Sequence, residues 1–323
     1  MAKTLLSPEM AFDAIAVSPR GQIAFAGGTA TRPPELHLAE SGGEIRRLSD
    51  FHAAFAGYPL SRPTFITYPS FDGMQIEAMV LAPPGVAAPL KLPTVVIPHG
   101  GPAWRFADGF QPLAQMLATT GHLVLLPNVR GSQGRSYEFM TLARNDWGGG
   151  DFRDLMAGID HLVAQGQADP ERLAIAGWSY GGYMAAWAVT QTDRFKAAVA
   201  GAGLFNLISE FGTEIQPSYD EWYFGLPWEN PQIYLERSPL THAARAKTPT
   251  LLLHGAEDLI DPLSQSLELY RALEHYGVAT ELVIYPREGH TLRERAHIRD
   301  RHQRSLDWLR KYLGTAGEPS QKK

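Results

Sequence analysis

One serine of the sequence stands where it could act as a nucleophile. The only G-x-S-x-G pattern in the chain is Gly177-Trp178-Ser179-Tyr180-Gly181. A strand-like run over residues 172–176 precedes it and a helical pattern begins near Tyr180, which is the strand–turn–helix context of a nucleophile elbow. Glycines are needed because side chains beside the serine would collide with backbone in so tight a turn. We therefore predict that Ser179 is a catalytic nucleophile.

A serine hydroxyl needs a histidine as its base and an acid that orients the histidine. After a nucleophile elbow the acid comes first in the chain and the histidine second. Three acids follow the apolar strand of residues 249–253, namely Glu257, Asp258 and Asp261. Asp261 precedes Pro262 and is typical of a helix N-cap, whereas Glu257 is typical of a solvated neighbour. We predict that Asp258 is the acid.

The histidine that fits the chain order is His290. It lies in a loop after the last predicted strand, residues 281–285. Three other downstream histidines lie inside helical patterns, where a packed or solvated role is more common; they are His275, His297 and His302. We predict that His290 is the general base.

The reaction also needs two backbone N–H groups that bind the developing oxyanion. Tyr180 follows the nucleophile and should supply one of them. The other should come from the loop after the strand of residues 94–98, which reads His99-Gly100-Gly101-Pro102. We predict Gly101 as this second donor, with an ordinary glycine turn as the alternative.

The elements that would position these residues alternate between strand and helix from Pro93 onward. The periodicity predicts strands and helices in turn, at 94–98, 110–120, 122–127, 151–165, 172–176, 180–190, 197–200, 249–254, 262–276, 280–285 and 292–313. Such alternation is typical of an α/β protein with a mostly parallel, doubly wound sheet.

The first 60 residues do not show this alternation of strands and helices. Short β segments separated by closely spaced turns predict a small antiparallel sheet over residues 1–60, and a hairpin-like pair follows at 64–68 and 75–81. We therefore expect a β-rich segment at 1–60, a catalytic domain at 61–315 and a flexible tail at 316–323.

Composition excludes several classes of protein. The chain has 29 basic and 34 acidic residues, so its net charge of −5 disfavours a nucleic-acid binder or a polybasic membrane protein. The absence of cysteine removes disulfides, thiolate metal sites and a cysteine nucleophile. No motif for a metal or a cofactor is present, so we expect none. Without an apolar run of about 18 residues or a signal-peptide pattern, we expect a cytoplasmic location and no membrane.

Taken together, residues 61–313 resemble the catalytic domain of the prolyl oligopeptidase family of serine peptidases, and the acylaminoacyl-peptidase-like subgroup in particular. The matching motifs are His99-Gly100-Gly101-Pro102, Pro127–Ser132 with Gly134, Trp147-Gly148-Gly149, Gly177–Tyr183, Ser238-Pro239-Leu240, His254–Asp258 and Tyr285–His290. The resemblance implies an α/β-hydrolase fold and hydrolysis of peptide, acyl-amino-acid or ester bonds through an acyl-enzyme. It gives Ser179, Asp258 and His290 the roles argued above.

The sequence departs from this family in three places. Family members usually carry a complete N-terminal β-propeller that covers the active site, whereas residues 1–60 resemble only the end of one. We therefore expect open access for small esters. Trp178 stands where the subgroup often has glycine, and Asp261 stands where relatives often have valine, a difference that we interpret as local.

Substrate contacts are harder to predict. Arg105 follows the oxyanion loop and could hold a substrate carboxylate, and Trp178 and Trp222 could line the pocket; solvated or packing roles are the alternatives. We expect a small ester or a short peptide as substrate. The alternatives are a carboxylesterase without meaningful peptidase activity and a non-catalytic interaction module. Residues 1–60 could form a homo-oligomer. The final basic helix has amphipathic spacing, which favours packing over nucleic-acid binding.

Overall fold

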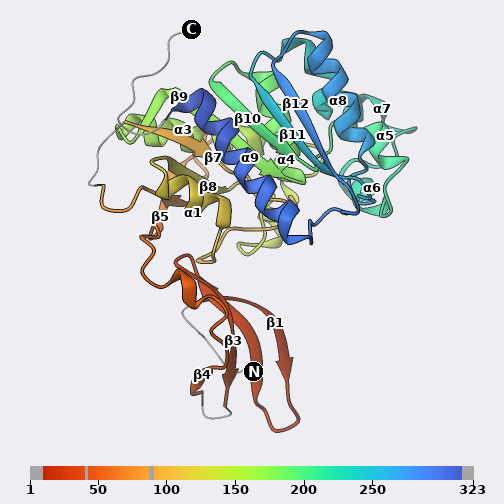
Figure 1. Ribbon diagram of the computed structural model, residues 1–323. Helices are drawn as coiled ribbons and strands as arrows, with labels where there is room; N and C mark the ends of the chain where they lie inside the picture. Colours follow the sequence, from red (N-terminus) through yellow and green to blue (C-terminus); the bar gives the residue numbers. More distant parts are fainter. Residues whose placement is uncertain (1–9, 41–42, 87–90, 315–323) are drawn as a thin grey trace.

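The computed structural model describes residues 10–40, 43–86 and 91–314, and the predicted flexible tail at 316–323 lies outside them. Its main element is an eight-stranded sheet with the order β12-β11-β10-β9-β7-β8-β6-β5 (Figure 1). The strands are β5 (Thr64–Pro69), β6 (Gln75–Leu81), β7 (Leu92–Val96), β8 (Leu123–Asn128), β9 (Ala168–Trp178), β10 (Phe195–Gly201), β11 (Thr250–Gly255) and β12 (Thr280–Tyr285). Only the pairs β5–β6 and β6–β8 are antiparallel. The prediction of a mostly parallel α/β sheet is confirmed.

Helices cover both faces of this sheet. On one face α1 (Pro112–Thr119) and α9 (Arg295–Leu313) enclose a core that includes Leu117 and Leu309. On the other face α3 (Gly150–Ala164), α4 (Tyr180–Gln191) and α8 (Ser264–His275) enclose a second core. The predicted helices are present, although α8 and α9 begin two to three residues later than the periodicity indicated.

The central helix α4 lies very close to the sheet. Its residues from Tyr180 to Thr190 are all buried. A Cβ at Gly182 would lie 2.3 Å from the carbonyl oxygen of Gly201 on β10, so only glycine permits this approach. The helix that follows Ser179 is thereby held against the middle of the sheet.

A set of short helices separates β10 from β11. It consists of α5 (Leu207–Phe211), α6 (Ser218–Phe224), α7 (Pro231–Arg237) and a 3-10 helix (Pro239–Arg245). A further short helix, α2 (Tyr137–Thr141), follows β8. None of the described helices has both the length and the apolar character that a membrane crossing requires.

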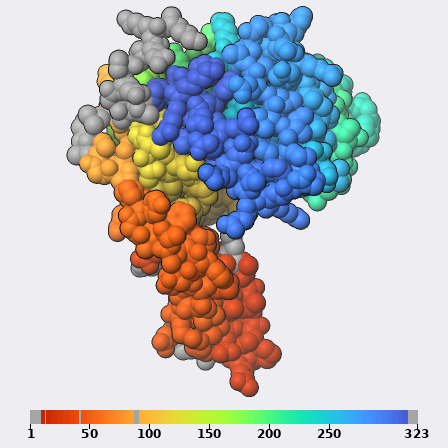
Figure 2. Space-filling model, in the orientation of Figure 1, coloured from red at the N-terminus to blue at the C-terminus, as the bar shows by residue number. Residues whose placement is uncertain are grey.

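The N-terminal region forms the predicted small antiparallel sheet. Its strands lie in sequence order: β1 (Ala11–Val17), β2 (Ile23–Thr29), β3 (Arg32–Ala39) and β4 (Ile45–Arg47). The sheet projects from the body of the molecule (Figures 1 and 2). At its base the Ala30 N–H donates to Asp108 (3.0 Å), and the Gln115 side chain donates to the Ala30 carbonyl (2.7 Å). The domain boundaries stated above stay predictions.

Candidate active site

Ser179 lies between the end of β9 and the start of α4, in a backbone conformation that is rare for a residue with a side chain (φ 61°, ψ −129°). The residues two positions before and two positions after it must be glycine. A Cβ at Gly177 would lie 2.1 Å from the carbonyl oxygen of Gly181, and a Cβ at Gly181 would lie 2.4 Å from that of Pro98. The Ser179 N–H donates to the Gly201 carbonyl (2.9 Å). The turn is thus tight on both sides of the serine.

Asp258 and His290 meet beyond the ends of β11 and β12. The His290 Nδ1–H donates to Asp258 Oδ2 at 2.8 Å. The other carboxylate oxygen, Oδ1, accepts the N–H groups of Ile260 (3.0 Å) and Asp261 (3.1 Å). Burial tends to raise the pKa of Asp258, but hydrogen bonds from His254 and His290 outweigh it and lower this pKa to about 2. Asp258 is therefore a fixed negative charge against the imidazole.

The same contacts act on the imidazole of His290. Burial lowers its pKa, whereas the hydrogen bond to Asp258 and the negative charges of Asp261 and Asp258 raise it, and the net pKa lies above the ordinary 6.5. The main chain of His290 is tied to the elbow, because the indole N–H of Trp178 donates to the His290 carbonyl at 2.8 Å. The residue before Ser179 thus positions the histidine loop.

The glycine loop after β7 lies beside the serine. A Cβ on Gly100 would lie 3.6 Å from the Cβ of Ser179 and 4.0 Å from its Oγ. Gly101 has a φ of +117°, which favours glycine, and its carbonyl accepts the hydroxyl of Tyr219 on α6 at 2.8 Å. The loop predicted to supply an oxyanion donor is therefore adjacent to Ser179 and is hydrogen-bonded to α6.

The buried side chain of His99 is hydrogen-bonded to this loop. Burial lowers the pKa of His99 to about 4, so the ring is neutral near pH 7. Its Nδ1–H donates to the Gly100 carbonyl (2.7 Å), and its Nε2 lies 2.7 Å from the hydroxyl oxygen of Ser132. Sequence reasoning missed this pair, because a histidine beside a glycine turn carries no signal of what it contacts.

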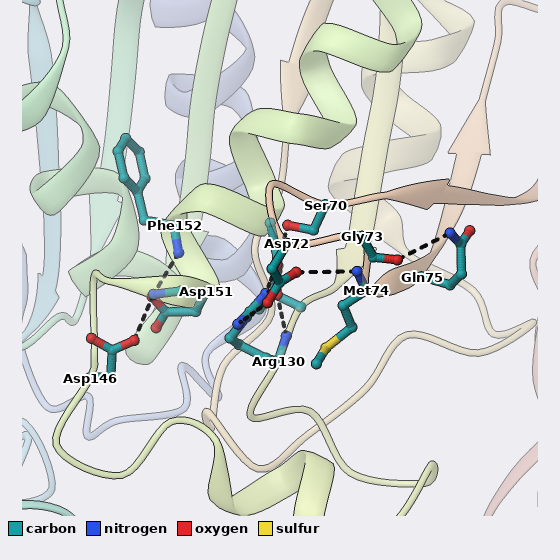
Figure 3. Close-up of polar contacts among 12 residues, drawn as sticks. Ser70, Asp72, Gly73, Met74, Gln75, Arg130, Asp146, Asp151 and Phe152 are labelled. Atoms are coloured by element: carbon teal, nitrogen blue, oxygen red, sulfur yellow. Dashed lines mark hydrogen bonds and ion pairs between the residues drawn. The ribbon is translucent and has the colours of Figure 1, made fainter.

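Two residues before Ser132, the Arg130 side chain forms ion pairs, and Figure 3 shows the one with Asp72. The Arg130 guanidinium donates to both oxygens of Asp154 on α3, at 2.9 and 2.8 Å, and to Asp72 of the β5–β6 turn at 3.1 Å. Asp154 is fully buried, and the Ser70 hydroxyl also donates to it. The 127–132 motif therefore has a structural explanation: it joins the loop after β8 to α3 and the hairpin.

A second buried acid anchors the residue after the nucleophile. Asp151 on α3 accepts the hydroxyl of Tyr180 and the N–H groups of Gly148 (3.1 Å) and Phe152 (2.6 Å). Burial raises the pKa of Asp151 to about 7 in spite of these hydrogen bonds. The ring of Trp147 lies against Tyr180 with 5.1 Å between centroids. The motif Trp147-Gly148-Gly149 thus belongs to the support of the elbow.

The three predicted substrate residues lie in different surroundings. Arg105 is exposed and lies over Gly134 of the loop after β8. Trp178 packs in the core on the α1–α9 face, with the Arg301 guanidinium 4.7 Å from its ring. Trp222 packs under Arg144, 4.8 Å from the guanidinium. Their roles in substrate binding stay predictions.

Asp261 is not the helix N-cap that the sequence indicated. The cap position of α8 is Leu263, because the turn of residues 258–263 is closed by the Asp258 carboxylate and delays the helix. The side chain of Asp261 is buried, and its Oδ2 has no hydrogen-bond partner. It lies near three further acids that sequence reasoning missed, Glu210, Glu214 and Asp220, which follow no recognisable motif.

Comparison with known proteins assigns the chain to a family. The model of the prolyl oligopeptidase family matches residues 109–316. The chain is 35% identical to the uncharacterized peptidase YuxL of Bacillus subtilis, over 84% of this chain and 42% of that protein. It is 30% identical to the acylamino-acid-releasing enzyme of Mus musculus, over 76% of this chain and 35% of that enzyme.

Solved structures agree with this assignment. The acylaminoacyl peptidase of Pyrococcus horikoshii superposes with a TM-score of 0.87 at 30% identity, covering 99% of this chain and 51% of that one. The chain therefore spans about half of that structure and less than half of the two curated relatives.

Proposed function

Since the chain belongs to the prolyl oligopeptidase family and is a serine hydrolase of that type, we propose that it cleaves acyl-amino-acid, short peptide and small ester bonds through an acyl-enzyme on Ser179. One observation carries the proposal: Ser179 is strained at a helix N-terminus, beside the glycine loop, and Trp178 links it to the His290 that Asp258 orients.

The proposed mechanism follows from these contacts. Ser179 Oγ attacks the carbonyl carbon of the substrate while its proton passes to Nε2 of His290. Asp258 holds Nδ1–H and stabilises the imidazolium that forms. The N–H groups of Tyr180 and Gly101 bind the oxyanion. His290 then protonates the leaving group, and water releases the acyl group from Ser179 by the same steps.

The surface around the serine supports access for small substrates. The His290 side chain is 16% exposed and Ser179 is half-buried. Trp104, in the segment after the glycine loop, and Leu259, beside Asp258, are exposed apolar side chains that could contact an acyl group. The name of the mouse relative indicates release of acylated amino acids, and we extend that substrate class to this chain.

The experiment is a matched substrate panel. p-Nitrophenyl esters of increasing acyl length and p-nitroanilides of acylated amino acids and short peptides are assayed side by side, with Ser179→Ala as the control. We expect hydrolysis of both classes by the wild-type chain and none by Ser179→Ala.

Each contrary result has its own meaning. Hydrolysis of esters alone would contradict the peptidase part of the proposal and leave a carboxylesterase. Activity that survives in Ser179→Ala would contradict the acyl-enzyme.

A further inference from the structure

Four acids, three of them buried and Glu214 half-buried, lie together between α5, α6 and the loop that carries Asp258. Glu210 is in α5, Glu214 follows it, Asp220 is in α6, and Asp261 comes from the loop before α8. Glu210, Asp220 and Asp261 are each at least 97% buried. Each of the first three, Glu210, Glu214 and Asp220, offers a carboxylate oxygen, and these oxygens all lie within 4.8 Å of one another.

Several oxygens of these acids lack a hydrogen-bond donor, although Glu214 Oε2 accepts the N–H of Gln216 at 2.8 Å. Across residues 10–40, 43–86 and 91–314, the buried carboxylate oxygens without a hydrogen-bond partner are Glu210 Oε2, Glu214 Oε1, both oxygens of Asp220 and Asp261 Oδ2. Elsewhere Asp154 has Arg130 and Ser70, and Glu288 has two backbone N–H groups and His297. The carboxylate oxygens without a partner therefore all belong to this cluster of four acids.

Burial and mutual repulsion disfavour the charged forms of these carboxylates. Burial, the contact with Asp220 and the neighbouring negative charges raise the pKa of Glu210 well above its ordinary value, and burial raises the pKa of Asp220. Without a cation, Glu210 and Asp220 can satisfy each other only by sharing a proton. A bound cation would remove the repulsion and supply a partner to every oxygen at once.

We propose that Glu210, Glu214 and Asp220 bind a Ca²⁺ ion, with Asp261 as a further negative charge beside it. Ca²⁺ takes carboxylate oxygens at about 2.3–2.6 Å in flexible geometry, so oxygens up to about 5 Å apart can share one ion. Mg²⁺ requires nearly octahedral ligands at about 2.1 Å and gives up its water reluctantly. Ligands drawn from a helix, a loop and a second helix suit the larger ion.

The position of this calcium site gives it a structural consequence. Asp220 is next to Tyr219, whose hydroxyl holds the Gly101 carbonyl. The N–H of Ile215, next to Glu214, donates to the Leu259 carbonyl at 3.0 Å. The ion would therefore hold together the segments that contact the oxyanion loop and the loop of the catalytic acid.

A second acidic cluster serves as an internal comparison. Glu288, Glu294 and His297 are equally close together, but Glu294 is paired with Arg287 (2.8 Å), and Glu288 accepts three donors. Its oxygens already have partners, so we assign no ion to it.

The test is calcium binding by the full chain after treatment with EDTA. Isothermal titration with CaCl₂ should show one ion per chain. At a hundredfold excess over Kd, Tm should rise by about 4 °C. Asp220→Asn and Glu210→Gln should each weaken binding at least about tenfold. The matched control is Glu221→Gln, the exposed neighbour of Asp220 on α6, which should bind as the wild type does.

Other results would overturn the calcium site or place it elsewhere. No heat and no Tm shift with CaCl₂ would overturn the calcium site in favour of a shared proton, and equal effects of MgCl₂ would overturn the choice of Ca²⁺. Wild-type affinity in Asp220→Asn and Glu210→Gln, or loss of binding in Glu294→Gln, would place the ion elsewhere. If Asp220→Asn does not fold, Glu214→Gln replaces it. Binding is measured without substrate, so the result is independent of the proposed hydrolysis.

Discussion

At the scale of single residues, Asp258 is distinguished from its neighbours by its contacts. It accepts hydrogen bonds from His290 Nδ1 and from the N–H groups of Ile260 and Asp261, whereas Glu257 is exposed. We predict that Asp258→Asn lowers kcat by about 10⁴-fold, because the amide no longer holds the required imidazole tautomer.

The matched control for this prediction is Glu257→Gln, which should leave kcat within about twofold of the wild type. Ester hydrolysis at saturating substrate measures both variants. A large loss in Glu257→Gln together with an active Asp258→Asn would reverse the assignment.

The pH dependence of the reaction should report His290. As a base it must be neutral, and its pKa is raised above 6.5. Activity should therefore be complete above this pKa and fall as the pH drops through it, so the acid limb of kcat/KM should have its midpoint above 6.5. Asp258→Asn removes the negative charge and should move the midpoint of the residual activity downward. A midpoint at or below 6.5 in the wild-type chain would contradict this assignment.

At the scale of elements, the Arg130–Asp154 pair joins three parts of the fold. It links the loop after β8 to α3, and Asp72 adds the β5–β6 turn. We predict that Arg130→Met destabilises the protein by about 3–5 kcal/mol, because it leaves the buried Asp154 carboxylate without its counter-charge.

Urea unfolding measures the effect of Arg130→Met. The control is Arg304→Met, which removes a half-exposed pair with Asp300 and should cost about 1 kcal/mol or less. Equal losses in the two variants would show that the Arg130 pair has no special role in joining these elements.

At the scale of the whole molecule, the N-terminal sheet has an unpaired edge. Among the described residues β1 pairs only with β2, and its side chains Ile15 and Val17 are exposed. Free edges with apolar side chains favour association with another strand. We predict that the chain forms a dimer through this edge.

Light scattering after size-exclusion chromatography measures the dimer directly. The wild-type chain should show about twice its 35.5 kDa mass. Val17→Lys should give a monomer, because a charge on a strand edge opposes pairing. Tyr276→Lys, at another exposed residue beyond the N-terminal sheet, should remain a dimer. A monomeric wild-type chain would refute the prediction.

The sequence alone determined the class of fold and the resemblance to a family of serine peptidases, because both depend on local patterns. The glycines around Ser179 are required by the turn itself, and alternating apolar periods identify parallel strands and their covering helices. Chain order then narrowed the choice to Asp258 and His290, whose hydrogen bond the structure shows.

Only the tertiary structure decided what supports the site, because burial and long-range contacts have no local signature. The contact of His99 with Ser132 spans 33 residues, and that of Tyr219 with Gly101 spans 118. Asp261 has the local signature of a helix cap, yet its carboxylate is buried beside other acids. A carboxylate's role depends on which donors and charges surround it, and the fold alone brings these together.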